Sequence, residues 1–444
     1  MSSAREAAIK VLRAVHTEGA YANVALAQEL RREKLNDADR RLATELVYGV
    51  VKAGETLDWI LSRYITRSLT KIPAVILEIL RLGIYQLFFL ERIPAAAVCN
   101  EAVKLAKKYG HQGTAGFVNA VLRTASREPE RGRFPEEEGN EIERLALETA
   151  HPAWLVRLWV EKFGVEETKA LCAFNNEPAR LSLRTNTLKI SRNALLKKLR
   201  AADIEAEPSN WAPEGILCRF PGALDNIEEL RAGLFQVQDE SSMQVAHVMA
   251  PLAGEFVIDG CSAPGGKTTH LAALMNNQGH IVAADIYPAK LERLRENAGR
   301  LGISNIKAIC CDARELGCRY PGQADRLLLD VPCSGLGVLR RRADARWRKK
   351  ESEIAALPAL QTEILKGAAP AVKAGGILVY STCTINEREN ESVVNAFLAE
   401  HDNFVLEMTG HFLPLKKRDE RMVQFYPQRD EIDGFFIARL RKTR

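Results

Sequence analysis

The feature of this sequence that most restricts its fold is the alternation of strand-like and helix-like segments from Leu234 onward. Short apolar runs, each compatible with one buried strand, are separated by stretches of helical periodicity. This order is typical of an α/β, doubly wound parallel sheet with helices on both faces. Seven strands are predicted, the last two close together near the end: Phe256–Asp259, Ile281–Asp285, Ile306–Cys311, Arg326–Asp330, Ile377–Ser381, Phe404–Met408 and Phe435–Leu440.

The chain is too long for this sheet to be its only domain. Its 444 residues, 46% hydrophobic and 27% charged, are typical of a soluble globular protein with two or three domains. The formal net charge is only +5, so any binding of nucleic acid must depend on local basic clusters.

The first segment, residues 1–126, is predicted to be an all-α domain. Apolar residues recur at helical spacing, and hardly any stretch is rich in strand-forming residues. Asn36 or Asp37 is suited to begin a helix, and Gly110 is suited to end one.

Three further segments follow. Residues 127–140 combine proline, glycine and charge with few apolar side chains, which predicts a linker. Residues 141–235 mix helical and strand patterns and are predicted to be a small α+β middle domain, a candidate RNA platform. Residues 236–444 form the predicted α/β domain.

The sequence predicts no membrane segment, disulfide framework or metal site. The N-terminal residues lack an apolar signal region, and the most apolar stretch, Ile72 to Leu90, contains Glu78 and Arg81. The cysteines number nine, an odd count, and no Cys-x-x-Cys pair occurs among them. We therefore expect a cytoplasmic monomer with reduced thiols and without a metal or a membrane partner.

A glycine-rich loop follows the first predicted strand and begins a helix. Glycines there let the backbone approach a ligand, and the helix N-terminus offers free N–H groups. Asp285 ends the next strand, where Rossmann folds place a carboxylate against a ribose, and Asp312 closes the third strand, a position suited to an adenine edge. The predicted cofactor-binding residues are Cys261, Ser262, Ala263, Pro264, Gly265, Gly266, Lys267, Asp285, Asp312 and Asp330.

The same loop has a competing interpretation as the phosphate-binding loop of an ATPase. Gly266-Lys267-Thr268 is followed, much later, by an apolar strand that ends in Asp330. A phosphate-binding loop needs a glycine five positions before the glycine of Gly-Lys-Thr, and Cys261 occupies that position. The spacing therefore argues against an ATPase.

Two cysteines follow the ends of predicted strands. Cys333 comes after the strand that ends at Asp330, and Cys383 after the strand that ends at Ser381. Ligands of an open α/β sheet bind outside the carboxyl ends of its strands, so both thiols are expected to face one crevice. The alternative is that both are ordinary structural cysteines buried by packing. Each thiol, however, is flanked by residues that end a strand and does not lie in the apolar middle of one, which favours a functional role.

The N-terminal segment resembles the NusB family of small helical RNA-binding proteins. The resemblance rests on Asn100–Lys107 and Phe117–Arg123 and covers about the first 125 residues. It implies contact with RNA, while a helical packing domain without RNA contact is the alternative.

The later motifs strongly resemble the RNA cytosine-C5 methyltransferase family, within it the bacterial 16S ribosomal RNA methyltransferase B group. The motifs are Gln238–Ser242, Pro264–Thr268, Asp330–Cys333 and Ser381–Cys383, and together with the NusB-like segment they span nearly the whole chain. Ser262 stands where alanine is common and Thr384 where serine is common, and neither alters a reacting group. The seven predicted strands suit the methyltransferase variant of the Rossmann architecture.

The resemblance implies S-adenosyl-L-methionine as cofactor and 16S ribosomal RNA as partner. It makes Cys383 the nucleophile that adds to C6 of cytosine, and Cys333 the residue that assists release. Asp330 contacts the base near the cofactor, and Lys267 orients cytosine or lowers a thiol pKa. The physics of the sequence alone leaves open which cysteine attacks. Methylation of tRNA by the same chemistry, and a non-catalytic role in ribosome assembly, are the alternatives.

A basic stretch follows the Cys333 loop. Such a stretch is usually a solvated face, but its nearness to the thiols favours contact with RNA phosphates, with Trp347 as a candidate for stacking on a base. The predicted RNA-binding residues are Arg340, Arg341, Arg342, Arg346, Arg348 and Lys349.

Overall fold

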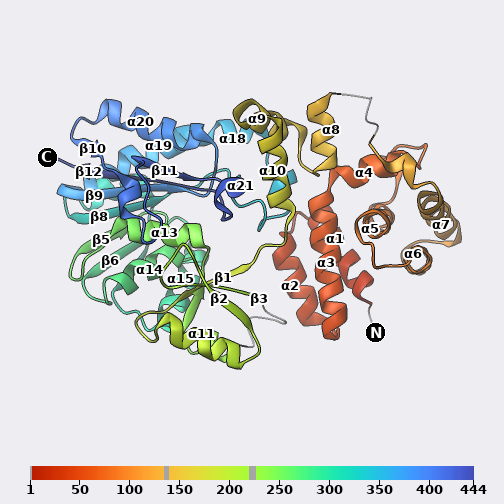
Figure 1. Cartoon of the computed structure of the whole chain (residues 1–444), viewed down its shortest axis with the longest axis horizontal. Coiled ribbons are helices and arrows are strands. Elements are labelled where there is room, and N and C mark those ends of the chain that lie inside the picture. Colours follow the sequence, from red (N-terminus) through yellow and green to blue (C-terminus); the bar gives the residue numbers. More distant parts are fainter. Residues whose placement is uncertain (1–2, 135–139, 220–226) are drawn as a thin grey trace. The chain divides into compact units, whose positions relative to one another are not determined.

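The computed structural model describes residues 3–134, 140–219 and 227–444 (Figure 1). These residues divide into two compact units. Met1–Asn176 with Arg341–Lys349 form the first, and Glu177–Arg340 with Lys350–Arg444 form the second. Part of the predicted linker, residues 135–139, lies outside the described residues.

In the described part of the first unit, all regular elements are helical, and those within residues 1–126 confirm the all-α fold predicted for that segment (Figure 1). Asn36 begins α3 by accepting the N–H of Asp39 at 2.8 Å, and Gly110 follows the last residue of α6, so both predicted helix boundaries are confirmed. The helices are α1 (Ala4–Thr17), α2 (Ala22–Arg32), α3 (Asp37–Ala53), α4 (Glu55–Ser62), α5 (Ala74–Phe89), α6 (Ala95–Tyr109), α7 (Gln112–Arg127), α8 (Glu141–Glu148), α9 (Ala153–Phe163), α10 (Val165–Asn176) and α17 (Ala345–Arg348).

One apolar core holds the first seven helices together. Leu12 of α1, Leu46 of α3, Ile79 of α5 and Leu122 of α7 are all fully buried in it. Burying a leucine or isoleucine contributes about 2 kcal/mol each, so this stripe of side chains stabilises the unit.

The second unit contains a small antiparallel sheet of four strands in the order β2-β3-β1-β4. Helix α11 (Arg192–Ala201) packs on it through Leu195 and Leu199. The strands are β1 (Leu181–Thr185), β2 (Glu205–Pro208), β3 (Gly215–Arg219) and β4 (Phe235–Val237), and the short helix α12 (Glu228–Arg231) precedes β4.

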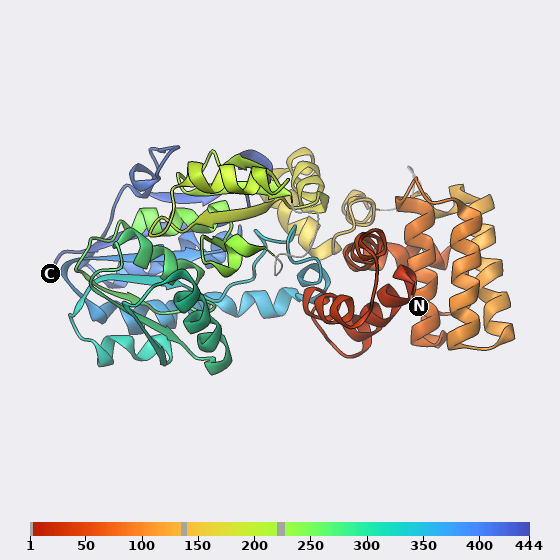
Figure 2. The same cartoon turned by 90° about the horizontal axis from the view of Figure 1, so that it is seen from below.

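The large sheet of the second unit, coloured green to blue in Figure 2, has the order β10-β12-β9-β8-β5-β6-β7, with β11 paired to β12. Strands β5 to β9 are parallel, and β12 runs antiparallel between β9 and β10. The strands are β5 (Phe256–Asp259), β6 (His280–Asp285), β7 (Ile306–Cys310), β8 (Ala324–Asp330), β9 (Val372–Thr382), β10 (Phe404–Leu406), β11 (Met422–Phe425) and β12 (Phe435–Lys442). The α/β fold class is confirmed, and β11 is an eighth strand that the sequence pattern did not predict.

Helices cover both faces of this sheet (Figure 1). Leu327 and Leu329 face one side and Leu328 the other, which explains why the strands are apolar throughout. One layer contains α13 (Glu240–Met249), α14 (Gly266–Leu274) and α15 (Pro288–Leu301), and the other contains α16 (Leu316–Arg319), α19 (Leu357–Ala368) and α20 (Glu391–Glu400). Two short helices, α18 (Glu351–Ala355) and α21 (Pro427–Asp430), complete the unit. Across the described ranges, no helix has both the length and the apolar character needed to cross a membrane.

Candidate active site

The parallel strands of the large sheet bring the predicted site residues to one edge. In the pairing of β8 with β9, Asp330 stands opposite Ser381, so the loops that carry Cys333 and Cys383 leave the sheet side by side. Strand β5 is parallel to β8 and ends at Asp259 on the same edge. The glycine-rich loop therefore begins beside the Cys333 loop, and the Cys383 loop lies on the far side of the Cys333 loop.

The two thiols are in contact. Cys333 Sγ and Cys383 Sγ are 3.3 Å apart, and both residues are partly exposed. The hydrogen bond with Cys383 and burial together raise the pKa of the Cys333 thiol well above its usual range. Two sulfurs this close titrate as a coupled pair, so each thiol affects the protonation of the other.

Lys267 and Asp330 form an ion pair beside the thiols. Lys267 Nζ donates to Asp330 Oδ2 at 2.6 Å, and Ser381 Oγ donates to Asp330 Oδ1 at 2.9 Å. Burial alone would lower the pKa of Lys267, but the charges of Asp330 and Cys383 raise it overall. Lys267 is therefore a cation at neutral pH that donates to the Asp330 carboxylate and interacts electrostatically with Cys383.

The glycine-rich loop borders a cavity of about 190 Å³. Gly265, with φ +99°, precedes α14, and a Cβ there would lie 2.7 Å from the side chain of Leu294. At Gly266 a Cβ would meet only the end of Gln238, 4.0 Å away, so the backbone is open to the cavity. The cavity is lined by Val237, Gln238, Asp239, Ser242, Asp259, Cys261, Ser262, Ala263, Pro264, Gly266, Lys267 and Asp330.

Asp285 and Asp312 lie at the ends of neighbouring strands, β6 and β7, but not in the cavity lining. Asp285 accepts the N–H of Ala263 at 3.2 Å and so supports the loop. Asp312 is ion-paired to Arg314 at 2.8 Å, and this hydrogen bond lowers the pKa of its carboxyl group.

Two buried residues of the site were not predicted from the sequence. Asp259 accepts the Thr268 hydroxyl at 2.7 Å through one oxygen, its other oxygen has no hydrogen-bond partner, and burial raises its pKa to about 7. Arg184 of β1 is 2% exposed and donates to the Gly266 carbonyl at 2.5 Å and to Thr269 Oγ1 at 2.9 Å, which fixes the start of α14. The position of Asp259 at the end of an apolar strand was the available sequence signal, whereas Arg184 had none.

The basic stretch does not form one solvated face. Arg346 is 1% exposed and donates to the Ala150 carbonyl and the Asn176 side chain, both at 2.8 Å. Its prediction as an RNA-binding residue is therefore wrong, because its guanidinium is used inside the first unit. The indole of Trp347 likewise donates to the Lys52 carbonyl at 3.0 Å.

The remaining basic residues differ in their surroundings. Arg348 donates to the Gly19 carbonyl at 3.0 Å, and Arg340 donates to the Pro178 carbonyl at 2.7 Å. Arg342 is exposed, and Arg341 and Lys349 are half-buried. Among the predicted residues, Arg342 has the most accessible side chain.

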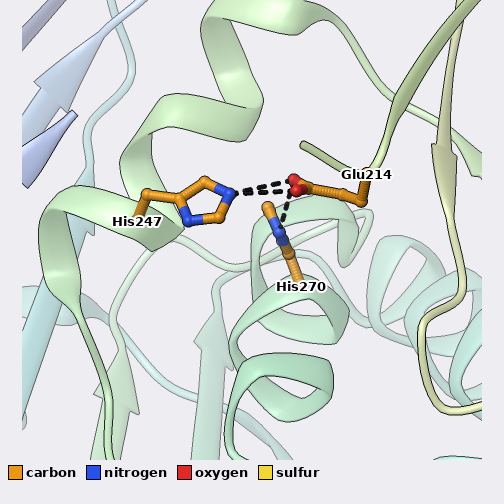
Figure 3. Close-up of side chains that lie close together, drawn as sticks. All are labelled: Glu214, His247 and His270. Carbon is orange, nitrogen blue, oxygen red and sulfur yellow. Dashed lines mark hydrogen bonds and ion pairs between the residues drawn. The ribbon is translucent and has the colours of Figure 1, made fainter. Parts of the chain in front are cut away.

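A cluster of Glu214, His247 and His270 lies outside the cavity lining (Figure 3). Its nearest ligand atoms lie within 4.8 Å of one another, a spacing that a metal ion also accepts. His247 Nε2, however, is hydrogen-bonded to both Glu214 oxygens at 3.1 Å, and Glu214 also acts electrostatically on the buried guanidinium of Arg184. The cluster is therefore explained as a hydrogen-bonded network that joins the segment before β3 to α13 and α14.

The strand order, the loop and the cavity define a Rossmann-like methyltransferase. Comparison with protein families agrees along the chain. A model described as 16S rRNA methyltransferase RsmB/F matches residues 246–441, the NusB family matches residues 2–127, and an RsmF/B-like, ferredoxin-like domain matches residues 151–225.

Full-length relatives identify the family. The probable ribosomal RNA small subunit methyltransferase B of Bacillus subtilis (strain 168) is 39% identical over 448 residues, covering 99% of each chain. The ribosomal RNA small subunit methyltransferase B of Pseudomonas syringae pv. tomato is 34% identical, covering 99% of this chain and 96% of the relative. This chain belongs to the ribosomal RNA small subunit methyltransferase B family.

Solved structures share the architecture. The crystal structure of PH0851 superposes with a TM-score of 0.84 at 28% identity, over 99% of this chain and 98% of that one. The structure of NSun6 from Pyrococcus horikoshii with SFG has a TM-score of 0.58 at 27% identity, over 65% of this chain and 97% of that one.

Proposed function

We propose that this protein transfers a methyl group from S-adenosyl-L-methionine to C5 of a cytosine in 16S ribosomal RNA. The observation that carries the proposal is the 3.3 Å contact between the sulfurs of Cys333 and Cys383, beside the Lys267–Asp330 ion pair. One thiol that adds to a base and a second group that assists release are what C5 methylation of a pyrimidine requires.

The cavity residues suit the cofactor. Asp259 offers a buried carboxylate oxygen without a partner, and the open backbone at Gly266 leaves room for close approach. The loop from Cys261 to Lys267 would hold the cofactor, with Asp285 supporting it from β6 and Asp312 close to the adenine end. S-adenosyl-L-methionine supplies an electrophilic methyl group when it is bound there.

Each side chain of the site has a separate role in the reaction at the cytosine base. The Cys383 thiolate forms a bond to C6, and the electron pair of the C5=C6 bond becomes available at C5 to take the methyl group. Asp330 contacts the base at N3, and Lys267 stabilises the Cys383 thiolate and fixes Asp330. The C5 proton leaves to a base, its electron pair restores C5=C6, and the S–C6 bond breaks to return the thiolate. Cys333 assists this last step.

The RNA is expected to reach the site as a single strand or with its target base turned out of a helix, because a thiol cannot reach C6 of a stacked base. We assign phosphate contacts to Arg340, Arg341, Arg342, Arg348 and Lys349, and further RNA contacts to the NusB-like residues 1–126 and the middle domain 141–235. The protein is proposed to act as a cytoplasmic monomer without a metal.

The experiment is methylation of purified RNA followed by bisulfite sequencing. We expect one cytosine of a 16S transcript to become resistant to bisulfite when protein and cofactor are both present, and a tRNA pool to stay unmodified. A resistant cytosine in tRNA alone would show that the same reaction takes place on tRNA and not on 16S ribosomal RNA. Absence of a resistant cytosine in every RNA, with the protein folded and binding cofactor, would overturn the proposal.

A further inference from the structure

A buried carboxyl group, Glu389, lies next to Ser334, the residue that follows Cys333, and its side-chain hydrogen-bond partners among the described residues include no basic group and no residue of the cavity lining. Glu389 is 0% exposed and ends a short 3-10 helix, Glu387–Glu389, that follows the Cys383 loop. A buried carboxyl group costs several kcal/mol unless it is fully hydrogen-bonded, so its partners define its role.

The carboxyl group of Glu389 accepts four hydrogen bonds. Oε2 accepts the backbone N–H of Ser334 at 2.8 Å and the Gln361 amide at 3.1 Å. Oε1 accepts the Ser334 hydroxyl at 2.5 Å and the Asn386 amide at 2.9 Å. All four bonds use the oxygens as acceptors, which is the pattern of an ionised carboxyl group.

These bonds join the two cysteine loops. Ser334 directly follows Cys333, and its hydroxyl also lies 2.7 Å from that of Thr384, which directly follows Cys383. Gln361 also donates to the Pro332 carbonyl at 3.0 Å, so the Cys333 loop is held on both sides of the thiol. The Tyr380 hydroxyl donates to the backbone carbonyl of Glu389 at 2.7 Å and ties this element to β9.

We propose that Glu389 is a positioning residue that holds the Cys333 and Cys383 thiols at contact distance. The proposal deepens the proposed function, on which the catalytic part of it rests. The negative charge of Glu389 also contributes to the raised pKa of the Cys333 thiol, although less than the hydrogen bond with Cys383 and burial do. This charge therefore helps to keep the proton on Cys333.

Glutamine cannot replace Glu389 in this network. The amide of Glu389→Gln has one acceptor oxygen and one NH₂ group, and each side of the present carboxyl group faces N–H or O–H donors. In one orientation its NH₂ group faces the backbone N–H of Ser334, and in the other it faces the amide of Asn386, so at least one of the four hydrogen bonds is lost and the two loops are held less firmly. Glu387→Gln is the matched control, because Glu387 is exposed on the same short helix.

The spacing of the thiols is measured without RNA or cofactor, by titration with phenylarsine oxide, which bridges two neighbouring thiols, followed by peptide mapping. We expect wild type and Glu387→Gln to be bridged between Cys333 and Cys383, and Glu389→Gln to bind the arsenical at that pair at least about tenfold more weakly. In methylation assays, kcat of Glu389→Gln is expected to fall about tenfold or more, with KM for the cofactor unchanged within about threefold.

Each outcome decides a separate point. Bridging of Glu389→Gln with wild-type affinity would overturn the positioning role, whatever its activity. Loss of bridging with full methylation would show that the spacing is not needed for the reaction and would overturn the catalytic part. Failure of wild type to methylate cytosine would refute the proposed function and leave the bridging result intact. If Glu389→Gln does not fold, Ser334→Ala, which removes the two hydroxyl contacts, is expected to weaken bridging in the same direction, and unchanged bridging in it would overturn the proposal.

Discussion

Lys267 at the start of α14 and Asp330 at the end of β8 form an ion pair with Nζ and Oδ2 2.6 Å apart. The pair joins the cofactor-side loop to the strand that leads to Cys333, so two parts of the site are held by one contact. Because the side chain of Lys267 is only 14% exposed, removing either partner would leave a largely buried charge without its counter-charge.

Replacing Lys267 by methionine is expected to abolish most of the methyl transfer. The substitution removes the cation that pairs with Asp330 and interacts electrostatically with Cys383, and loss of one such group costs about 100-fold or more in kcat. Single-turnover methylation with labelled cofactor measures the effect. Lys366→Met is the control, because Lys366 pairs with Glu400 on the surface of the same unit, and its activity should match wild type. Equal loss in both variants would contradict a specific role for Lys267.

His270 is expected to make the protein sensitive to acid. Burial lowers the pKa of His270 to about 4, whereas its pKa in the unfolded chain is about 6.5. Between these values the unfolded state binds the extra proton, so the stability contributed by neutral His270 is present above about pH 6.5 and falls by about 1.4 kcal/mol per pH unit on acidification.

Urea unfolding between pH 4 and pH 7 tests this dependence. His270→Asn should lose stability less steeply on acidification than wild type, whereas His280→Asn, at an exposed position, should follow wild type. Parallel curves for His270→Asn and wild type would show that another group controls the acid sensitivity.

Arg346→Ala is expected to destabilise the first unit rather than to weaken RNA binding directly. The substitution leaves the carbonyls of Ala150 and Asn175 and the Asn176 side chain without their buried donor, which costs about 3 kcal/mol. Thermal or urea unfolding measures the loss. Arg342→Ala, at an exposed position, is expected to change stability by less than about 0.5 kcal/mol. Equal stability of the two variants would contradict the assignment of Arg346 to the interior.

Arg342→Glu is expected to weaken RNA binding and to lower the slope of log K against log salt by about one, because a phosphate contact is lost. Arg444→Glu is the charge-matched control. Strand β12 runs antiparallel to β9, and Arg441 pairs with Ile377 in the middle of β9, so β12 ends on the side of the sheet away from Cys383. If both variants bind RNA at low salt like wild type, with the same slope of log K against log salt, Arg342 does not contact RNA phosphates.

Periodicity predicted much of the fold because it depends on local signals. The caps at Asn36 and Gly110 are where expected, and the parallel strands begin and end within a few residues of the predicted bounds. Strand β11 escaped prediction because Met422–Phe425 is short and pairs only with β12, at the side of the sheet.

The site was only partly predictable. Strand ends placed Asp330, Cys333 and Cys383 at one edge because parallel strands share their direction. Arg346 was assigned to RNA because a run of positive charge does not reveal that one guanidinium is buried among carbonyls. Glu389 carries no sequence signal of its own, since two of its partners, Ser334 and Gln361, come from distant parts of the chain.

The central claim is that Cys383 attacks the base and that Cys333 assists its release. The most direct measurement is a denaturing gel of each Cys→Ala variant after incubation with 16S RNA and cofactor. Cys333→Ala is expected to form a stable covalent protein–RNA complex, because addition proceeds and release fails, while Cys383→Ala is expected to form none. A stable complex from Cys383→Ala, with none from Cys333→Ala, would contradict the account and reverse the two roles.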